Sequence, residues 1–339
     1  MAISFSNKKS QPQQAAGHFL SLKLEKQPSL SNKKAVFYTA TAIILVIILL
    51  LAFNVLEAKK DVNRNDVTLA RVKTMDNFVK NMDNDLKRAI NIACIRATLS
   101  LEERIAKQGT YLTNAETAYA EAMMNGTING TALELMQDST FPLWVSKIQA
   151  EAAKTGIQAN FQVHSIQVYQ DDPWHVKGKI NITINVTDSR NTSSWIEQKE
   201  IIASTSIIGL EDPLYALNTY GRVPNVINMT SYEGDYVSGS NVGNLLIHLN
   251  NSYYAANTDA PSFLMRFQNN LSTSPFGIES MINLDKLQKQ GLSIQSKTAI
   301  DYLYWGSAST TNYRVNGTPS WYYIDSGHTA KYQVTGLTY

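Results

Sequence analysis

Few residues of this 339-residue chain have the types and spacing that acid–base or metal chemistry requires. Asp171, Asp172 and His175 stand close together in sequence and offer either metal ligands or an acid–base pair. The same residues suit a tight turn, in which an aspartate accepts backbone N–H groups and Pro173 fixes φ. We therefore treat these three as a weak acid or metal cluster, with a simple turn as the alternative.

Other chemical signals are weaker. Glu211 with Asp212, and Asp325 with His328, allow the same two interpretations. The histidines follow no His-Glu-x-x-His spacing, and the chain has no phosphate-binding glycine loop and no Gly-x-Ser-x-Gly elbow. The single cysteine, Cys94, excludes an internal disulfide and a cysteine-rich zinc site. We predict no catalytic residue and no cofactor, and a net charge of +2 gives no reason to expect nucleic acid.

Nine asparagines begin Asn-x-Ser/Thr sequons, the acceptor pattern for N-linked glycans on exported domains. All of them lie on the C-terminal side of residue 56, which indicates that this side is exported and glycosylated. The candidate glycosylation sites are Asn125, Asn129, Asn181, Asn185, Asn191, Asn228, Asn250, Asn270 and Asn316.

The elements that position these residues are organised around residues 35–56, an apolar run without a charge. As a helix, about 22 residues would extend about 33 Å, enough to cross the hydrocarbon core of a bilayer. The alternatives are a buried core helix and a cleavable secretory signal, but the run is longer than a usual signal core and no Ala-x-Ala site follows it. The sequence therefore predicts one transmembrane helix, with the lipid bilayer as its partner.

Residues 1–34 contain six lysines and one acid among Ser, Gln, Asn and Pro, which predicts a disordered basic tail. The count of Lys and Arg on the two flanks favours the N-terminal side as cytoplasmic. Together with the sequons, this orientation predicts a single-pass protein of the cell membrane whose C-terminal domain is extracytoplasmic.

Residues 57–109 predict a stalk helix. Their apolar residues recur at a mean interval of about 3.6 from Val62 to Ile105, and Gly109 marks the end. This apolar stripe would pack either against the chain's own sheet or against another copy in a coiled coil or filament. Cys94 lies next to the stripe and is expected to be a buried, inert thiol.

Residues 110–156 predict two short helices, the first capped by Asn114 or Thr113 and the second by Ser139 or Thr140. The period then changes from 3.6 to 2, so residues 157–210 predict strands, with a slip in register near Ser165. Short connections between successive strands indicate an antiparallel β-meander.

The clearest strand of the meander places Asn181 and Asn185 on its polar face and a row of isoleucines on the other. Residues 211–339 are rich in Gly, Asn, Ser, Thr and Tyr. We expect them to form a β-rich extension or subdomain, with small helices at 261–267 and 284–290.

The junction Lys34-Ala35-Val36, followed by a continuous helix and a meander, resembles archaeal type IV pilin-like proteins over about residues 33–210. The resemblance implies an α+β fold, in which one N-terminal helix, first transmembrane and then amphipathic, packs on the antiparallel meander. It also implies prepilin-type cleavage at Lys34, Ala35 and Val36, and a structural or adhesive role at the cell surface rather than catalysis.

Two classes of function follow from these features. The first is a membrane-anchored surface glycoprotein, or pilin-like filament subunit, that associates with itself through the stalk helix or contacts other surface proteins or glycans. The second is a type II membrane-anchored enzyme, such as a glycosyltransferase or hydrolase, with residues 62–107 as its stem. The second class requires a pocket into which at least two acidic or histidine side chains converge.

Overall fold

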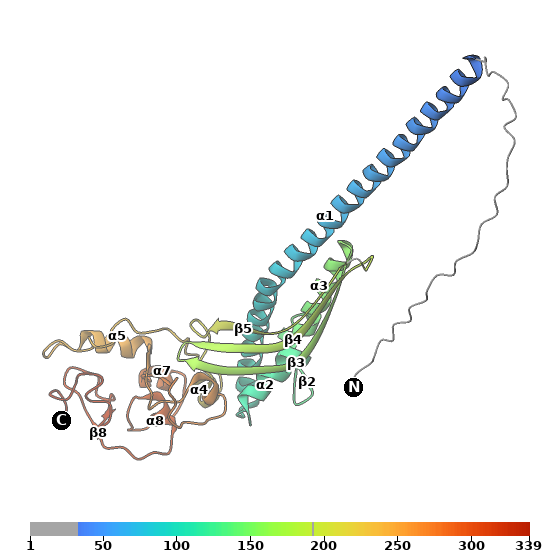
Figure 1. Ribbon diagram of the computed structural model, residues 1–339. Helices are drawn as coiled ribbons and strands as arrows, with labels where there is room; N and C mark the ends of the chain where they lie inside the picture. Colours follow the sequence, from blue (N-terminus) through green and yellow to red (C-terminus); the bar gives the residue numbers. More distant parts are fainter. Residues whose placement is uncertain (1–32, 192) are drawn as a thin grey trace, which may run out of the picture. The chain divides into compact units, whose positions relative to one another are not determined.

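The computed structural model describes residues 33–339 except Thr192, without the side chains of residues 33–41 and 57–66. Residues 1–32, most of the predicted basic tail, thus lie outside the described residues. The chain divides into two compact units, residues 1–65 and residues 66–339. The fold is α+β, with helices and antiparallel sheets (Figure 1).

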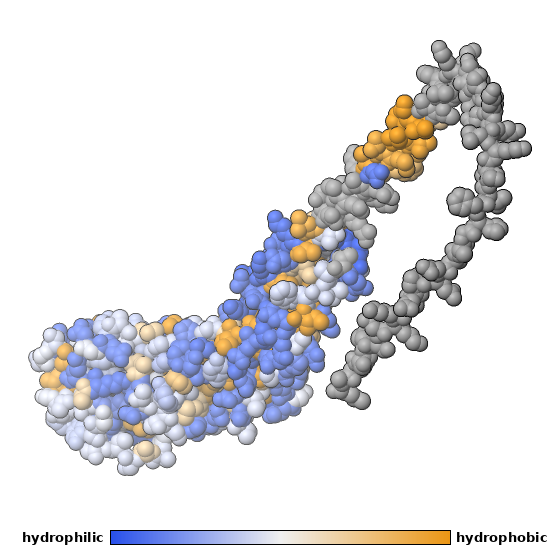
Figure 2. Space-filling view, in the orientation of Figure 1, coloured by the Kyte–Doolittle hydropathy of each residue, from blue (hydrophilic) through white to orange (hydrophobic). Residues whose placement is uncertain are grey.

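Helix α1 (Lys33–Gln108) contains both the predicted membrane span and the predicted stalk. Between Ile43 and Leu56 its large apolar side chains are each about half exposed or more, and Figure 2 shows them as an apolar band. Within the described residues, no helix is long and apolar enough to cross a membrane. Of the predicted span 35–56, only residues 42–56 have described side chains.

The C-terminal part of α1 forms one side of the main core. From Met75 onward the predicted stripe is buried, with Val79 half-buried, so packing against the chain's own sheet is confirmed for this part. Leu69 and Val72, which precede this part of the stripe, are exposed. Cys94 is buried as predicted, and burial raises the pKa of its thiol to about 11. The buried residues of the stripe are Met75, Met82, Leu86, Ala89, Ala93, Ala97, Leu101 and Ile105.

The end of α1 and the next two helices follow local signals. Gly109, at φ 63°, donates its N–H to Ile105 and ends α1. Asn114 caps α2 (Ala115–Asn125), and Thr140 caps α3 (Phe141–Lys154), as the sequence indicates. Between them the structure adds a small hairpin, β1 (Thr127–Ile128) with β2 (Thr131–Ala132), and a 3₁₀ turn (Glu134–Met136), which were not predicted.

The predicted meander is confirmed as a three-stranded antiparallel sheet of order β3-β4-β5. The strands are β3 (Ile157–Asp172), β4 (His175–Asp188) and β5 (Ser194–Ser206). The expected slip appears as a register shift between Val163 and Ser165. The sequence predicted strands as far as residue 210, whereas β5 ends at Ser206 and the N–H of Leu210 bonds the Ile207 carbonyl in a turn beyond it.

Alternate residues of β4 are fully buried, and this apolar face packs into the same core as α1. Gly178 lies on this face. A Cβ built at Gly178 would stand 2.7 Å from Cγ2 of Ile90 in α1, closer than real carbon atoms pack. The absence of a side chain at Gly178 therefore lets α1 approach the sheet.

We expect Gly178→Ala to destabilise the fold by about 1–3 kcal/mol, because the added methyl group overpacks the contact with Ile90. Urea unfolding followed by tryptophan fluorescence measures the change. Gly336→Ala is the matched control, since nothing lies within 4 Å of a Cβ at that position. Equal stability of the two variants would contradict this account of the helix–sheet contact.

The expectation that residues 211–339 are β-rich is wrong. They form short helices and two small two-stranded sheets, β6-β7 and β8-β9, joined by turns. The two predicted small helices are confirmed as α6 and α7. The helices are α4 (Pro213–Asn218), α5 (Gly243–Asn251), α6 (Phe263–Arg266), α7 (Leu284–Lys289) and α8 (Asp301–Trp305), and the strands are β6 (Tyr254–Ala256), β7 (Ile278–Ser280), β8 (Asn312–Tyr313) and β9 (Ile324–Asp325).

This C-terminal region shares a core with the helix and the sheet. Tyr254, Phe263 and Phe267 belong to the same buried cluster as Leu86 and Ile182. The ring of Phe267 packs edge-on against Tyr119 of α2, with centroids 5.6 Å apart. Residues 211–339 therefore belong to the same compact unit as the helix and the sheet, and they also have two buried apolar clusters of their own.

Candidate functional site

The predicted cluster of Asp171, Asp172 and His175 closes the hairpin between β3 and β4. Asp172 accepts the N–H of Trp174 and Nδ1 of His175, both at 2.8 Å, and Asp171 pairs with Lys177 at 2.5 Å. Partial burial raises the pKa of Asp172, but the hydrogen bonds from His175 and Trp174 outweigh it and lower the pKa. These side chains stabilise an exposed turn, as the alternative interpretation expects.

A metal centre finds no support elsewhere in the described part of the chain, where no group of three or more His, Cys, Asp or Glu side chains could hold a metal ion.

The structure places all nine sequon asparagines within reach of solvent. Asn181 and Asn185 are half-buried on the outer face of β4, and the other seven are exposed. Gln198 of β5 donates to Oδ1 of Asn181 at 3.2 Å. Lys34, Ala35 and Val36, the predicted cleavage site, fall in the first turn of α1, where side chains lie outside the described residues.

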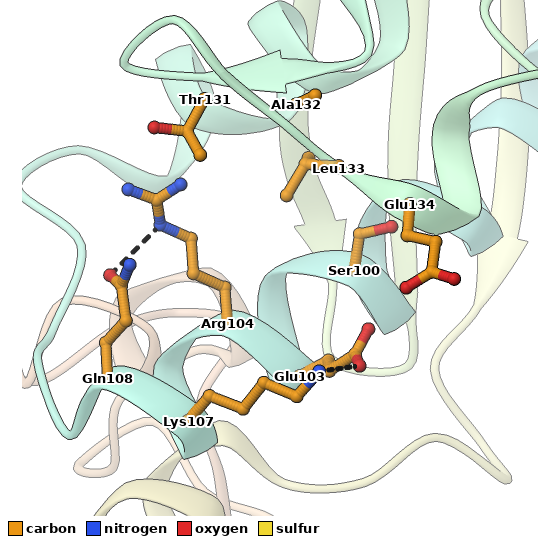
Figure 3. Close-up of a pocket in the computed structure, with 9 residues that line it drawn as sticks. All are labelled: Ser100, Glu103, Arg104, Lys107, Gln108, Thr131, Ala132, Leu133 and Glu134. Carbon is orange, nitrogen blue, oxygen red and sulfur yellow. Dashed lines mark hydrogen bonds and ion pairs between the residues drawn. The ribbon is translucent and has the colours of Figure 1, made fainter.

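A surface cavity of about 220 Å³ lies between the last turns of α1 and the segment 131–134 (Figure 3). On the α1 side, Lys107 pairs with Glu103 at 2.5 Å, and Nε of Arg104 donates to Gln108 at 3.1 Å. Arg104 also donates to the Ile128 carbonyl at 3.2 Å. The charged groups of Glu103, Arg104 and Lys107 are thus engaged by neighbours on the protein.

The lining of this cavity holds no histidine or cysteine. Ser100, its one serine, donates to the Arg96 carbonyl at 2.8 Å, so its proton is held by the backbone and not by a histidine or an acidic side chain. The cavity can accept a small polar or charged group at the surface, but its side chains form no nucleophile–base pair.

Two buried networks of charged side chains lie in the C-terminal region. Arg266 of α6 is fully buried and bonds Asp212 at 2.6 Å and Asp301 at 2.9 Å. Tyr254 donates to Asp212 at 2.7 Å, and the hydroxyl and N–H of Ser280 donate to Asp301. This network, which we call the Arg266 cluster, joins the starts of α4 and α8 to α6 and β7.

A second buried network surrounds His328 and is called the His328 cluster. Nδ1 of His328 lies 2.8 Å from Asp325, and Nε2 lies 3.0 Å from Glu279. Glu279 also pairs with Lys331 at 2.6 Å and accepts the Tyr332 hydroxyl at 2.9 Å. The cluster therefore balances two carboxylates against one lysine and one imidazolium.

The surroundings fix the protonation states of this cluster. Burial lowers the pKa of His328, but the bonds to Asp325 and Glu279 outweigh it and raise the pKa to about 9. Burial likewise raises the pKa of Glu279, yet His328 and Lys331 bring it down to about 2. Both groups are charged at neutral pH, and their mutual attraction stabilises the fold.

The charge on His328 predicts a loss of stability at alkaline pH. Its pKa is raised in the folded state, so its contribution is full below the ordinary pKa of 6.5 and disappears as pH rises through about 9. We expect a loss of about 3 kcal/mol across this range. Urea unfolding at several pH values should show this slope in the wild-type chain.

His328→Gln should remove most of this alkaline slope, whereas His164→Gln, at an exposed position on β3, should leave it intact. A wild-type profile that stays flat from neutral to alkaline pH would contradict the assignment of an imidazolium to His328.

Sequence reasoning found part of these networks. Asp325 with His328, and Asp212, were considered as chemical candidates because their acids and histidine are near one another in sequence. Glu279 and Arg266 were missed, since their partners lie 49, 54 and 35 residues away. The only signal was composition: an arginine between Met265 and Phe267, and a glutamate following Ile278, each in an apolar run.

Comparison with known proteins gives no match to a family model, to a curated protein or to a solved structure.

Proposed function

We propose that this protein is a single-span, membrane-anchored surface protein with a structural or interaction role, pilin-like in build. Residues 35–56 would lie in the bilayer, the basic tail in the cytoplasm, and residues 66–339 outside the membrane. We call residues 66–339 the head, which would contact other surface components or copies of itself.

The observation that carries this proposal is the apolar band of α1. From Ile43 to Leu56 no residue is charged, and the large apolar side chains are each exposed by 49% or more. Soluble proteins rarely leave so continuous an apolar surface in water. Lipid would cover this band, because a helix satisfies its own backbone polar groups in a bilayer.

The sequons support the proposed orientation. Glycan transfer requires an asparagine side chain that an enzyme can reach, and none of the nine asparagines is buried. Asn181 and Asn185 stand on the outer face of the sheet, opposite the face that packs into the core with α1. Sugars at these two positions would cover the sheet without disturbing its core.

A filament subunit is the closest variant of this proposal. The apolar stripe of α1 continues upstream of its buried part as Leu69 and Val72, which are 68% and 42% exposed. In an assembly of α1 helices these residues would contact a neighbouring copy. Prepilin-type cleavage before Ala35 would leave the apolar band in the mature chain.

Mass spectrometry of the protein from membranes of its own cells tests the proposal. We expect the chain to remain with the membranes in alkaline carbonate and to carry glycans on sequons of residues 125–316. Protein beginning at Ala35 in shed filaments would support the filament variant. A chain that is freely soluble without detergent and bears no glycan would contradict the proposal.

The enzyme alternative loses its best candidate site. It requires converging acidic or histidine side chains in a pocket, whereas Asp171, Asp172 and His175 close an exposed turn. The His328 cluster has converging groups, but these are buried and paired with one another.

A further inference from the structure

One buried carboxylate in the C-terminal region holds a lysine amine and an asparagine amide at the same time. Glu279, in the middle of β7, is fully buried. Its Oε1 lies 2.6 Å from Nζ of Lys331, and its Oε2 accepts Nδ2 of Asn257 at 2.5 Å. The amine and the amide are therefore held side by side on the two oxygens of one carboxylate.

Further contacts bring the amine to the chain segment that carries the amide. Nζ of Lys331 also donates to the carbonyl of Ala256, the residue before Asn257, at 3.0 Å. The side-chain oxygen of Asn257 accepts the N–H of Asp259 at 3.0 Å. This backbone donor lies where negative charge would develop if a nucleophile attacked the amide carbon.

We propose that Lys331 and Asn257 are joined by an intramolecular isopeptide bond, with Glu279 as the proton-transfer group. An amine, an amide, a carboxylate and a donor to the amide oxygen are the parts that such an acyl transfer needs. The proposal is independent of the membrane anchor and adds a self-modification site in the head.

The step is balanced within the chain. The neutral amine of Lys331 attacks Cγ of Asn257, and the Asp259 N–H stabilises the charge on Oδ1. Oε1 of Glu279 accepts a proton from Nζ, and the carboxyl group returns a proton through Oε2 to Nδ2. The Cγ–Nδ2 bond breaks and ammonia leaves. The products are one secondary amide and one ammonia, with no oxidation and no co-reactant.

The surroundings of Glu279 favour this chemistry. Tyr332 donates to Oε1 at 2.9 Å, and His328 lies 3.0 Å from Oε2 and pairs with Asp325, so the carboxylate is held from several sides. Lys331 is 24% exposed, which gives ammonia a short path to solvent. The reaction consumes the neutral amine, so it should proceed faster at alkaline than at acidic pH.

The bond would close a loop that contains α6, β7, α7, α8, β8 and β9. The chain has one cysteine and can form no internal disulfide, so no disulfide cross-links this region. A head outside the cell would gain resistance to proteolysis and to pulling forces, because the isopeptide bond would keep the loop between Asn257 and Lys331 closed.

Mass spectrometry of the full chain, purified in detergent and kept folded, tests the proposal. We expect a branched tryptic peptide that joins the Asn257 and Lys331 segments and weighs one ammonia less than the two separate segments together. Cyclisation at Asn125-Gly126, Asn129-Gly130 or Asn316-Gly317 also releases ammonia. The branched peptide separates the two reactions, and mild alkali opens the cyclic imide but not the isopeptide bond.

Lys331→Arg is the decisive variant. It keeps a cation beside Glu279 but offers no nucleophilic amine, so the branched peptide should be absent while the chain stays folded. Lys297→Arg, at a lysine that donates to the Gly306 carbonyl, is the matched control and should retain the branched peptide. Glu279→Gln should slow bond formation about 10²-fold or more.

A folded wild-type chain whose Asn257 and Lys331 remain in separate peptides, even after prolonged incubation at alkaline pH, would overturn the proposal. So would a branched peptide in the Lys331→Arg variant, since another amine would then be the nucleophile. If Glu279→Gln fails to fold, the comparison of Lys331→Arg with Lys297→Arg still decides between the two outcomes.

Discussion

Arg266→Met should destabilise the head by about 3–5 kcal/mol, the largest loss we expect from one substitution. Arg266 is the counterion of Asp212 and Asp301, and all three side chains have no exposed surface. Methionine would leave two carboxylates buried without a positive partner. Urea unfolding of the full chain in detergent, followed by tryptophan fluorescence, measures the loss.

Two further variants separate the charge effect from simple loss of packing. Arg266→Met combined with Asp212→Asn and Asp301→Asn removes the unpaired charges and should recover a substantial part of the lost stability. Arg190→Met, at an exposed position, should stay within about 0.5 kcal/mol of wild type. If the triple variant is less stable than Arg266→Met alone, unpaired charge is not the cause.

Ile47→Lys combined with Leu50→Lys should release the protein from membranes. Both side chains lie in the apolar band and are at least 50% exposed. Each lysine near the centre of a membrane helix costs about 2.5–3.5 kcal/mol, so the pair should lower membrane insertion by orders of magnitude. Fractionation of cells in alkaline carbonate measures the membrane-bound fraction.

Leu69→Lys combined with Val72→Lys is the matched control, because these exposed apolar residues lie on the same helix outside the band. The control should remain membrane-bound, and should lose assembly if the upstream stripe contacts another copy. Equal retention of both double variants in the membrane fraction would show that the band does not anchor the chain.

Local signals in the sequence were sufficient for the helix-and-sheet part of the fold. Gly109 ends α1, Asn114 and Thr140 cap the next two helices, and alternation in β4 marks the core face of the sheet. Each of these signals acts between residues a few positions apart. The apolar stripe of α1 and the apolar face of the sheet must both be shielded from water. This requirement predicted the burial of the stripe beyond Met75.

The C-terminal region could not be predicted in the same way, because long-range polar pairs organise it. Arg266, Asp212 and Asp301 come from three different elements, and no periodic pattern identifies them as partners. Its strands are two or three residues long, too short for alternation to be read. Abundant Gly, Asn and Thr suggested strands, whereas the structure uses them largely in turns such as that at Asn269, with φ 51°.

The group of side chains around Glu279 could not be predicted from the sequence for the same reason. Asp325 and His328 lie three residues apart and were noticed, but the lysine and the asparagine that share Glu279 are distant in sequence from it and from each other. Only the folded chain brings an amine and an amide to one carboxylate.

Thiol labelling of sealed cells tests the central claim most directly. Cys94, the one native cysteine, is fully buried, so the labelling of an engineered cysteine can be measured with little labelling of the native one. We expect a membrane-impermeant maleimide to label Ser320→Cys in the exposed part of the head, and to label Ser10→Cys in the tail only after lysis. Labelling of Ser10→Cys but not of Ser320→Cys in sealed cells would contradict an anchored protein whose head lies outside.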